Sequence, residues 1–258
     1  MTASRAVKVK TLRDRISDEE WRLRVDLAAA YRLCALFGWD ELIFTHLSAR
    51  VPGPEHHFLV NPFGLMFEEI TASNLLKVDL EGQLVGEADA SINPAAFVIH
   101  GAIHGAREDA RVVLHLHTVA GVAVAAQRDG LLPISQNALV VLGELAYHDY
   151  EGLAVGMDER QRLIADLGKH HYLILRNHGL LTVGESVAAA FVRLYFLQRA
   201  CEMQVAALAG NRAVIAQDDS AIERVGGQGQ AAFSDRVADV AWAALKRKLD
   251  RHDPSYDH

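Results

Sequence analysis

The spacing of hydrophobic and polar positions changes along the chain, and the changes predict alternating helices and strands. Apolar residues recur at helical spacing in residues 17–39, 93–109, 118–130, 158–169 and 185–210. Short apolar or alternating runs predict strands at residues 44–51, 56–62, 75–85, 111–117, 144–150 and 171–179. Residues 226–250 predict a flexible break rich in glycine and glutamine, followed by a last helix. Strands that alternate with helices through one continuous core predict an α/β fold.

The whole chain, residues 1–258, is expected to form a single domain. Half of its residues are hydrophobic, which is enough for a sizeable core. Residues 1–15 begin with a polar, basic stretch and predict a loose N-terminal arm, and residues 211–258 predict a helical C-terminal extension. Ser17 or Asp18 is placed to cap the first long helix, because acidic residues fill the turn that follows.

Composition argues against several classes of partner. The formal net charge is −7, and no basic cluster exceeds three residues, so nucleic acid is not an expected partner. The sequence has no uninterrupted apolar run of about 18 residues, so it predicts no membrane span. The N-terminus lacks the apolar core of a signal peptide. Cys34 and Cys201 lie in apolar helical segments and are expected to be buried and reduced, which favours a cytoplasmic protein.

Two histidines stand out in the strand predicted at residues 111–117. Side chains two positions apart on a strand share a face, so His115 and His117 project together. His178, at the end of another apolar strand and before a glycine that permits close backbone approach, is the best third partner. Three neutral imidazoles with one open position form the catalytic type of metal site.

A purely structural role is also open to each histidine of the chain. A buried histidine is often only a hydrogen-bonded core residue. His100 and His104 are four apart on a predicted helix, which is also ligand spacing, but a helix face that touches solvent or a pocket accounts for them better. His148 lies among polar groups and fits either a pocket acid/base or a turn residue.

Several separated motifs, in the right order, resemble the class II aldolase/adducin family and particularly the adducin head and its bacterial relatives. They are HLHT (115–118), LILRNHGLL (173–181), VNPFGLMFEEITASNL (60–75), GLLPIS (130–135), YHDYEG (147–152), VGESV (183–187) and ACEMQV (200–205). The resemblance implies a three-layer α/β/α sandwich with a central, mostly antiparallel sheet, and a homotetramer. It also implies a cation on His115, His117 and His178, with Zn²⁺ expected and Mn²⁺ or Fe²⁺ as alternatives.

The chain departs from the sugar-phosphate aldolases that it resembles. Their metal-side glutamate corresponds to Ala96, which cannot carry a proton, and their paired serines correspond to Pro94 and Ala95. An asparagine of their phosphate-binding loop corresponds to His46, and Phe63 replaces a small hydroxyl residue. Phosphate recognition needs such donors, so a sugar phosphate is not the expected substrate.

The expected function is a divalent-metal-dependent lyase, of aldolase or decarboxylase type, that acts on a small hydroxy or oxo acid or an aldehyde-derived substrate. His148, Tyr147 or Glu144 could supply the proton. Phe63, Met66 and Phe67 suggest either an apolar pocket wall or ordinary core packing. Two alternatives remain, which are a non-haem Fe(II) oxygenase on the same fold and a non-catalytic, oligomerising module like the adducin head.

Overall fold

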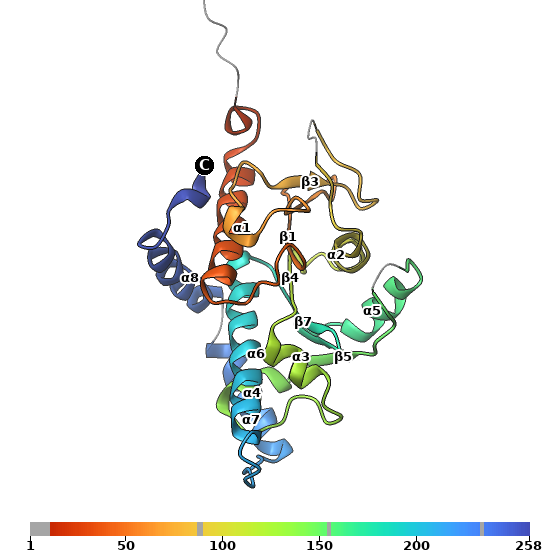
Figure 1. The fold of residues 1–258 in the computed structure, drawn as a ribbon, viewed down its shortest axis with the longest axis vertical. Helices are drawn as coiled ribbons and strands as arrows, with labels where there is room; N and C mark the ends of the chain where they lie inside the picture. Colours follow the sequence, from red (N-terminus) through yellow and green to blue (C-terminus); the bar gives the residue numbers. More distant parts are fainter. Residues whose placement is uncertain (1–10, 87–89, 154–155, 233–234) are drawn as a thin grey trace, which may run out of the picture.

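A mixed sheet divides the molecule into two helical layers (Figure 1). The computed structural model describes residues 11–86, 90–153, 156–232 and 235–258. Within these ranges the strands are β1 (His46–Arg50), β2 (Phe58–Val60), β3 (Leu76–Val78), β4 (Val112–Leu116), β5 (Leu145–His148), β6 (Tyr172–Leu175) and β7 (Gly179–Gly184). The α-helices are α1 (Asp18–Leu36), α2 (Pro94–Ala106), α3 (Val119–Ala125), α4 (Gln136–Leu142), α5 (Glu159–Leu167), α6 (Val187–Leu208), α7 (Asp219–Ala232) and α8 (Asp235–Asp250). Short 3₁₀ helices span Leu12–Asp14, Phe67–Glu69 and Ser255–Asp257.

The strand order is β3-β2-β1-β4-β7-β6-β5. Neighbouring strands are antiparallel except β5 and β6, which run parallel. The mostly antiparallel sheet that the family resemblance implies is therefore confirmed. Among the described residues, no helix is both long enough and apolar enough to cross a membrane.

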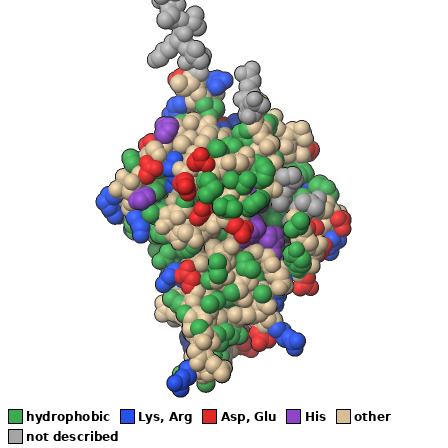
Figure 2. All heavy atoms as spheres, viewed as in Figure 1, with side chains coloured by type: hydrophobic (Ala, Val, Ile, Leu, Met, Phe, Trp, Pro, Cys, Tyr) green, Lys and Arg blue, Asp and Glu red, His purple; other side chains and the backbone are tan. Residues whose placement is uncertain are grey.

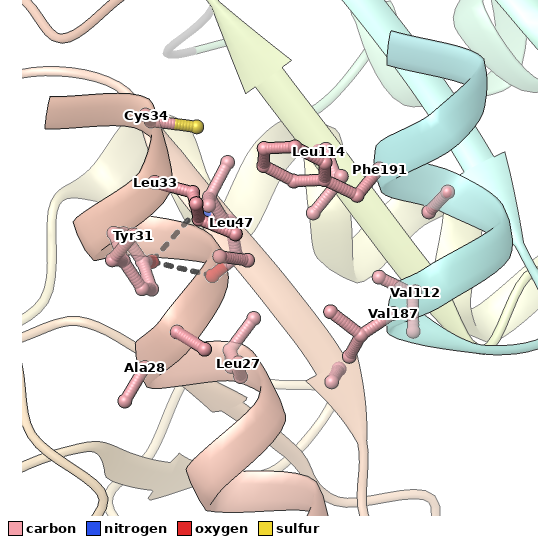
Figure 3. Packing of buried hydrophobic residues seen from close by; sticks show 14 of the residues in the cluster. Leu27, Ala28, Tyr31, Leu33, Cys34, Leu47, Val112, Leu114, Val187 and Phe191 are labelled. Atoms are coloured by element: carbon pink, nitrogen blue, oxygen red, sulfur yellow. Dashed lines mark hydrogen bonds between the residues drawn. The ribbon is translucent and has the colours of Figure 1, made fainter. Parts of the chain in front are cut away.

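The two faces of the sheet carry separate hydrophobic clusters. On one face, Leu114 of β4 packs with Leu27 of α1 and Phe191 of α6 (Figure 3). On the other face, Val113 packs with Ile103 of α2 and with residues of α5. Figure 1 shows α1, α6 and α8 on one side of the strands and α2 and α5 on the other. This arrangement confirms the expected α/β/α layers.

A buried tyrosine fixes the position of β1 beneath α1. The backbone N–H groups of Leu47 and Asn61 donate to the Tyr31 hydroxyl oxygen at 2.8 and 3.2 Å. Figure 3 shows this hydroxyl directed from α1 to the strand. Leu47 belongs to the cluster beneath α1, so its neighbours on β1, His46 and Ser48, point toward α2.

The structure differs from the sequence prediction around residues 171–179. The predicted strand is divided, because β6 ends at Leu175 and His178 lies in the turn before β7. Strand β7 was not predicted, although it lies between β4 and β6 in the sheet. Its residues are buried along their full length, which removes the alternation that a half-buried strand would show.

The glycine- and glutamine-rich segment is helical, in contrast to the predicted flexible break. Gly226 and Gly229 lie within α7, which packs against α4. A Cβ at Gly226 would lie 3.7 Å from the Cα of Gly143, and one at Gly229 would lie 3.0 Å from Val140. The first distance is an ordinary contact, whereas the second is closer than a Cβ normally approaches, so Gly229 permits the close contact between these helices. Residues 1–10 of the predicted arm lie outside the described residues.

Candidate metal centre

Three histidines from two neighbouring strand ends converge at one point. His115 lies on β4, His117 directly follows it, and His178 comes from the β6–β7 turn. Their ring centroids are 4.6 to 4.8 Å apart, and one nitrogen of each lies within 4.8 Å of the others. The glycine after His178 allows the approach, since a Cβ at Gly179 would lie 2.5 Å from the Leu116 carbonyl oxygen.

Hydrogen bonds on the far side of two rings set which nitrogens face the centre. His115 Nδ1 donates to the Leu180 carbonyl oxygen at 3.0 Å, and His117 Nδ1 donates to Glu41 Oε2 at 2.7 Å. In the neutral rings, both Nε2 atoms then carry lone pairs, and these atoms are 2.9 Å apart. Two facing lone pairs cannot hydrogen-bond to each other, whereas a cation satisfies both. The donor set therefore fits a divalent metal ion.

Burial keeps the imidazoles in the form that a metal ion requires. Desolvation, followed by the nearby His178 and His117, holds the pKa of His115 well below its ordinary value. Desolvation and the neighbouring His117 lower the pKa of His178 to about 4. Both rings are therefore neutral at physiological pH and can donate lone pairs.

The histidines lie in a pocket of about 660 Å³, a size suited to a small molecule. Figure 2 shows histidine side chains reaching the surface near the middle of the view, between hydrophobic side chains. The lining residues are Glu41, Leu42, Phe44, Thr45, His46, Phe63, Asn93, Ile99, His115, His117, Val122, Tyr150, Gly152, Leu153, Asn177 and His178. Among these described residues there is no lysine or arginine, and Glu41 is the sole acid.

Backbone strain is concentrated at the pocket. Leu42, Thr45 and Asn177 have φ values of 50°, 67° and 55°, in the left-handed region that residues with a Cβ rarely adopt. All three line the pocket, and Thr45 is β-branched, so its conformation is especially unfavourable. Strain of this kind persists where the surrounding structure enforces it, and it gathers at functional sites.

The pocket includes residues that the sequence did not single out as site residues. Glu41 orients His117, and Thr45 and His46 line the wall next to His115. The hydroxyl of Thr45 is buried without a hydrogen-bond partner among the described residues. A sequence signal for His46 existed, since polar residues alternate at His46, Ser48 and Arg50 within an otherwise apolar strand.

The helix face at His100 and His104 differs from the expectation that it touches solvent or a pocket. Both side chains are fully buried. His100 Nε2 lies 2.9 Å from His46 Nδ1, so this face of α2 reaches the pocket only through another residue.

The structure does not bring the three predicted proton donors to the pocket lining. His148 is buried at the end of β5, with its Nδ1 2.7 Å from Asp166 Oδ2. The Tyr147 hydroxyl accepts from the Leu131 backbone N–H at 3.0 Å. Glu144 pairs with the imidazole of His171 at the opposite end of β5.

The structure also shows where the residues lie that differ from those of the sugar-phosphate aldolases, and where their neighbours lie. Ala96 is buried among the apolar residues of β2 and β3 and does not line the pocket. Phe63 does line it and is 40% exposed. Phe67 instead packs edge-on against Tyr31 in the core, with the ring centroids 4.7 Å apart, and Met66 is absent from the lining. Cys34 and Cys201 are buried free thiols, as predicted.

Comparison with known proteins identifies the family. The family model described as "Class II Aldolase and Adducin N-terminal domain" matches residues 25–205. The structure of an aldolase II superfamily protein from Pseudomonas syringae is 51% identical, with a TM-score of 0.92 over 96% of this chain and 99% of that one. L-fuculose 1-phosphate aldolase from Glaciozyma antarctica PI12 is 28% identical, with a TM-score of 0.79 over 92% of each chain. Alpha-adducin of Rattus norvegicus is 52% identical over 190 residues, which are 72% of this chain and 26% of the adducin. The chain therefore belongs to the family of class II aldolases and adducin N-terminal domains.

Proposed function

We propose that the chain is a divalent-metal-dependent lyase that cleaves a carbon–carbon bond of a small hydroxy or oxo acid, by aldol cleavage or decarboxylation. In this proposal Zn²⁺ is held by His115, His117 and His178. The observation that carries it is the convergence of three imidazoles, two of them with fixed tautomers, in one pocket. When bound, the cation would supply a Lewis acid that stabilises negative charge on a carboxylate or enolate oxygen.

The chain's own residues orient the imidazoles and shield the site. The Leu180 carbonyl and the Glu41 carboxylate each hold one ring by its Nδ1, and partners of this kind raise the basicity of a ligand and fix its direction. Phe44 and Phe63, with ring centroids 6.5 Å apart, form an apolar wall. Such a wall would give a bound substrate a less polar surface on one side of the site.

The pocket is poorly suited to a phosphate ester. No cationic side chain is found among its described lining residues, and phosphate sites rely on cations or converging N–H donors. Glu41, the sole acid among the described lining residues, is already engaged with His117. Decarboxylation begins without a base, so it tolerates the absence of a carboxylate at Ala96 better than aldol cleavage does. The L-fuculose 1-phosphate aldolase similarity supports carbon–carbon lyase chemistry in general.

We further propose that the chain works as a homo-oligomer, a tetramer by the family resemblance. Leu42 and Leu153 line the pocket and are 63% and 81% exposed. Large apolar side chains that are this exposed around a site favour coverage by another subunit. Size-exclusion chromatography with light scattering would test the state, since a monomer at micromolar concentration contradicts the proposal.

The 52% identity to alpha-adducin supports a competing proposal, a non-catalytic oligomerising module. A turnover assay separates the two. Zinc-loaded protein is screened with 2-oxo and 2-hydroxy acids for release of CO₂ or aldehyde, with sugar phosphates in parallel. We expect turnover of an acid that His178→Ala abolishes and that His170→Ala, a change at an exposed histidine, leaves intact. Metal-loaded protein without turnover of either class would favour the module, and iron with O₂ uptake would favour the oxygenase.

A further inference from the structure

A continuous row of buried polar side chains leads from the back of α2 to the pocket. His104 and His100 lie one helical turn apart, about 6 Å along the axis, and Ser48 and His46 lie two residues apart on β1, a similar distance. Ser48 Oγ lies 2.7 Å from His104 Nε2 and 2.6 Å from His100 Nδ1. His100 Nε2 lies 2.9 Å from His46 Nδ1. All four side chains are at most 3% exposed.

The far end of the row fixes the position of every proton in it. His104 Nδ1 lies 3.1 Å from the Ala110 carbonyl oxygen, which can only accept, so this nitrogen carries the hydrogen. Burial lowers the pKa of His104 to about 3, so its Nε2 is a lone pair and accepts the Ser48 hydroxyl hydrogen. The hydroxyl oxygen must then accept from His100 Nδ1–H.

The same reasoning continues to the pocket. Burial holds the pKa of His100 well below its ordinary value, so its Nε2 is a lone pair and accepts from His46 Nδ1–H. The hydrogen of the neutral His46 ring is thereby placed on Nδ1. His46 Nε2 is therefore left as a lone pair, and no described residue hydrogen-bonds to it. His46 lines the pocket beside His115, its in-register partner on β4, with the two ring centroids 5.7 Å apart.

A second unsatisfied group lies next to it. Thr45 also lines the pocket, and its hydroxyl is buried without a partner among the described residues. Consecutive residues of a strand normally face opposite sides, but Thr45 precedes β1 and has a φ of 67°, which takes it out of that alternation. Two consecutive residues, Thr45 and His46, thus both line the pocket, and the described residues give neither the Thr45 hydroxyl nor His46 Nε2 a hydrogen-bond partner.

We propose that His46 Nε2 and Thr45 Oγ1 form a subsite for a hydroxyl group of the substrate, next to the three clustered histidines. The substrate hydroxyl donates to His46 and accepts from Thr45, so both groups gain the partner that they lack. This inference rests on the proposed function, because it assigns the substrate of that site to hydroxy acids and related hydroxylated compounds.

The polarity of the subsite also determines what it rejects. A phosphate dianion has no hydrogen to donate, so its oxygens would face the lone pair of His46 unfavourably. A keto oxygen or a bare methyl group would likewise leave His46 without a hydrogen bond. The row of buried side chains thereby acts at a distance, because Ser48 and His104 set the donor and acceptor roles of a side chain that they do not touch.

The tautomers can be read without metal or substrate. Histidine-selective ¹⁵N labelling and long-range ¹H–¹⁵N correlation distinguish Nδ1–H from Nε2–H rings. We expect His46, His100 and His104 to be neutral Nδ1–H tautomers at pH 7, assigned by single substitution to phenylalanine. A hydrogen on His46 Nε2 would overturn the proposal, whatever the protein's metal content or activity.

Binding then tests the subsite itself. Zinc-loaded protein is titrated calorimetrically with glycolate, which has the hydroxyl, and with acetate, which lacks it. Chelation of the metal favours glycolate in any variant, so the change in the glycolate-to-acetate affinity ratio is the readout. We expect Thr45→Val to lower this ratio about fivefold, the effect of one hydrogen bond, while raising the melting temperature because an unpaired buried hydroxyl is removed.

An unchanged ratio in Thr45→Val, in protein shown to hold zinc, would refute the subsite. Loss of zinc binding in the wild type would instead refute the proposed function, and the tautomer measurement would still stand. Inorganic phosphate serves as a further probe, and we expect it to bind at least tenfold more weakly than glycolate.

Discussion

Replacement of Ser48 by alanine tests the buried row of polar side chains directly. The change deletes one oxygen and leaves His100 Nδ1–H and His104 Nε2 without partners at fully buried positions. An unsatisfied buried polar group costs about 1–3 kcal/mol. Two such groups, partly relieved by local relaxation, should lower the free energy of unfolding by about 3 kcal/mol. For a chain of this size, that corresponds to a melting temperature lower by about 6 °C.

The assay is urea and thermal unfolding of metal-free protein at one protein concentration. Ser91→Ala, at an exposed serine, is the matched control and should stay within about 0.5 kcal/mol of the wild type. A double-mutant cycle with His100→Leu sharpens the test, because the effect of Ser48→Ala should shrink once one of the stranded partners is gone. A loss below about 0.5 kcal/mol in Ser48→Ala would show that the imidazoles have other partners and would refute the reasoning.

Three further predictions follow from contacts around the site. Glu41→Gln removes the carboxylate that accepts from His117, and it should weaken zinc binding about 10- to 100-fold in a chelator competition. Equal zinc affinity in the variant and the wild type would mean that this contact does not orient His117. Gly179→Ala places a Cβ 2.5 Å from the Leu116 carbonyl oxygen, so it should lower the free energy of unfolding by about 1–3 kcal/mol and reduce the zinc content. An unaltered melting temperature would contradict this close approach of the two backbones. Burial lowers the pKa of His104 to about 3 from an unfolded value near 6.5, so between these pH values the unfolded chain binds more protons than the folded one. The free energy of unfolding should therefore fall as the pH drops below 6.5, by up to about 1.4 kcal/mol per pH unit for this histidine. Equal urea midpoints of the metal-free protein at pH 7 and pH 5 would argue against the neutral burial of His104.

Individual helices and strands were predictable where periodicity and end signals agreed, whereas the α/β/α layers were expected from the family resemblance. Helix α1 begins after Ser17, whose side chain accepts from the Glu20 backbone N–H, and α5 ends just before Gly168, which has a positive φ. Strand β7 was missed because Gly179–Gly184 is buried on both faces and shows no alternation. Helix α7 was missed because glycines that favour a loop in isolation are used for close packing against α4.

The candidate site was predictable only as far as local spacing reaches. His115 and His117 share a strand face by geometry alone, so their pairing could be derived from the sequence. The contact of His46 with His100 spans 54 residues and depends on how α2 lies across β1. The partner of His117, Glu41, likewise comes from a distant loop. Such contacts cannot be predicted from the spacing of residues, because they form only when distant segments come together in the tertiary fold.

Metal content, measured by inductively coupled plasma mass spectrometry, tests the central claim most directly. Protein is purified without added metal, then incubated with zinc and desalted. We expect close to one cation per chain in the wild type and in His170→Ala. In His115→Ala we expect the bound metal to be at least tenfold lower, with an unchanged circular dichroism spectrum. A wild type without metal after this treatment, or equal metal content in all three proteins, would contradict the assignment of the three histidines as a metal centre.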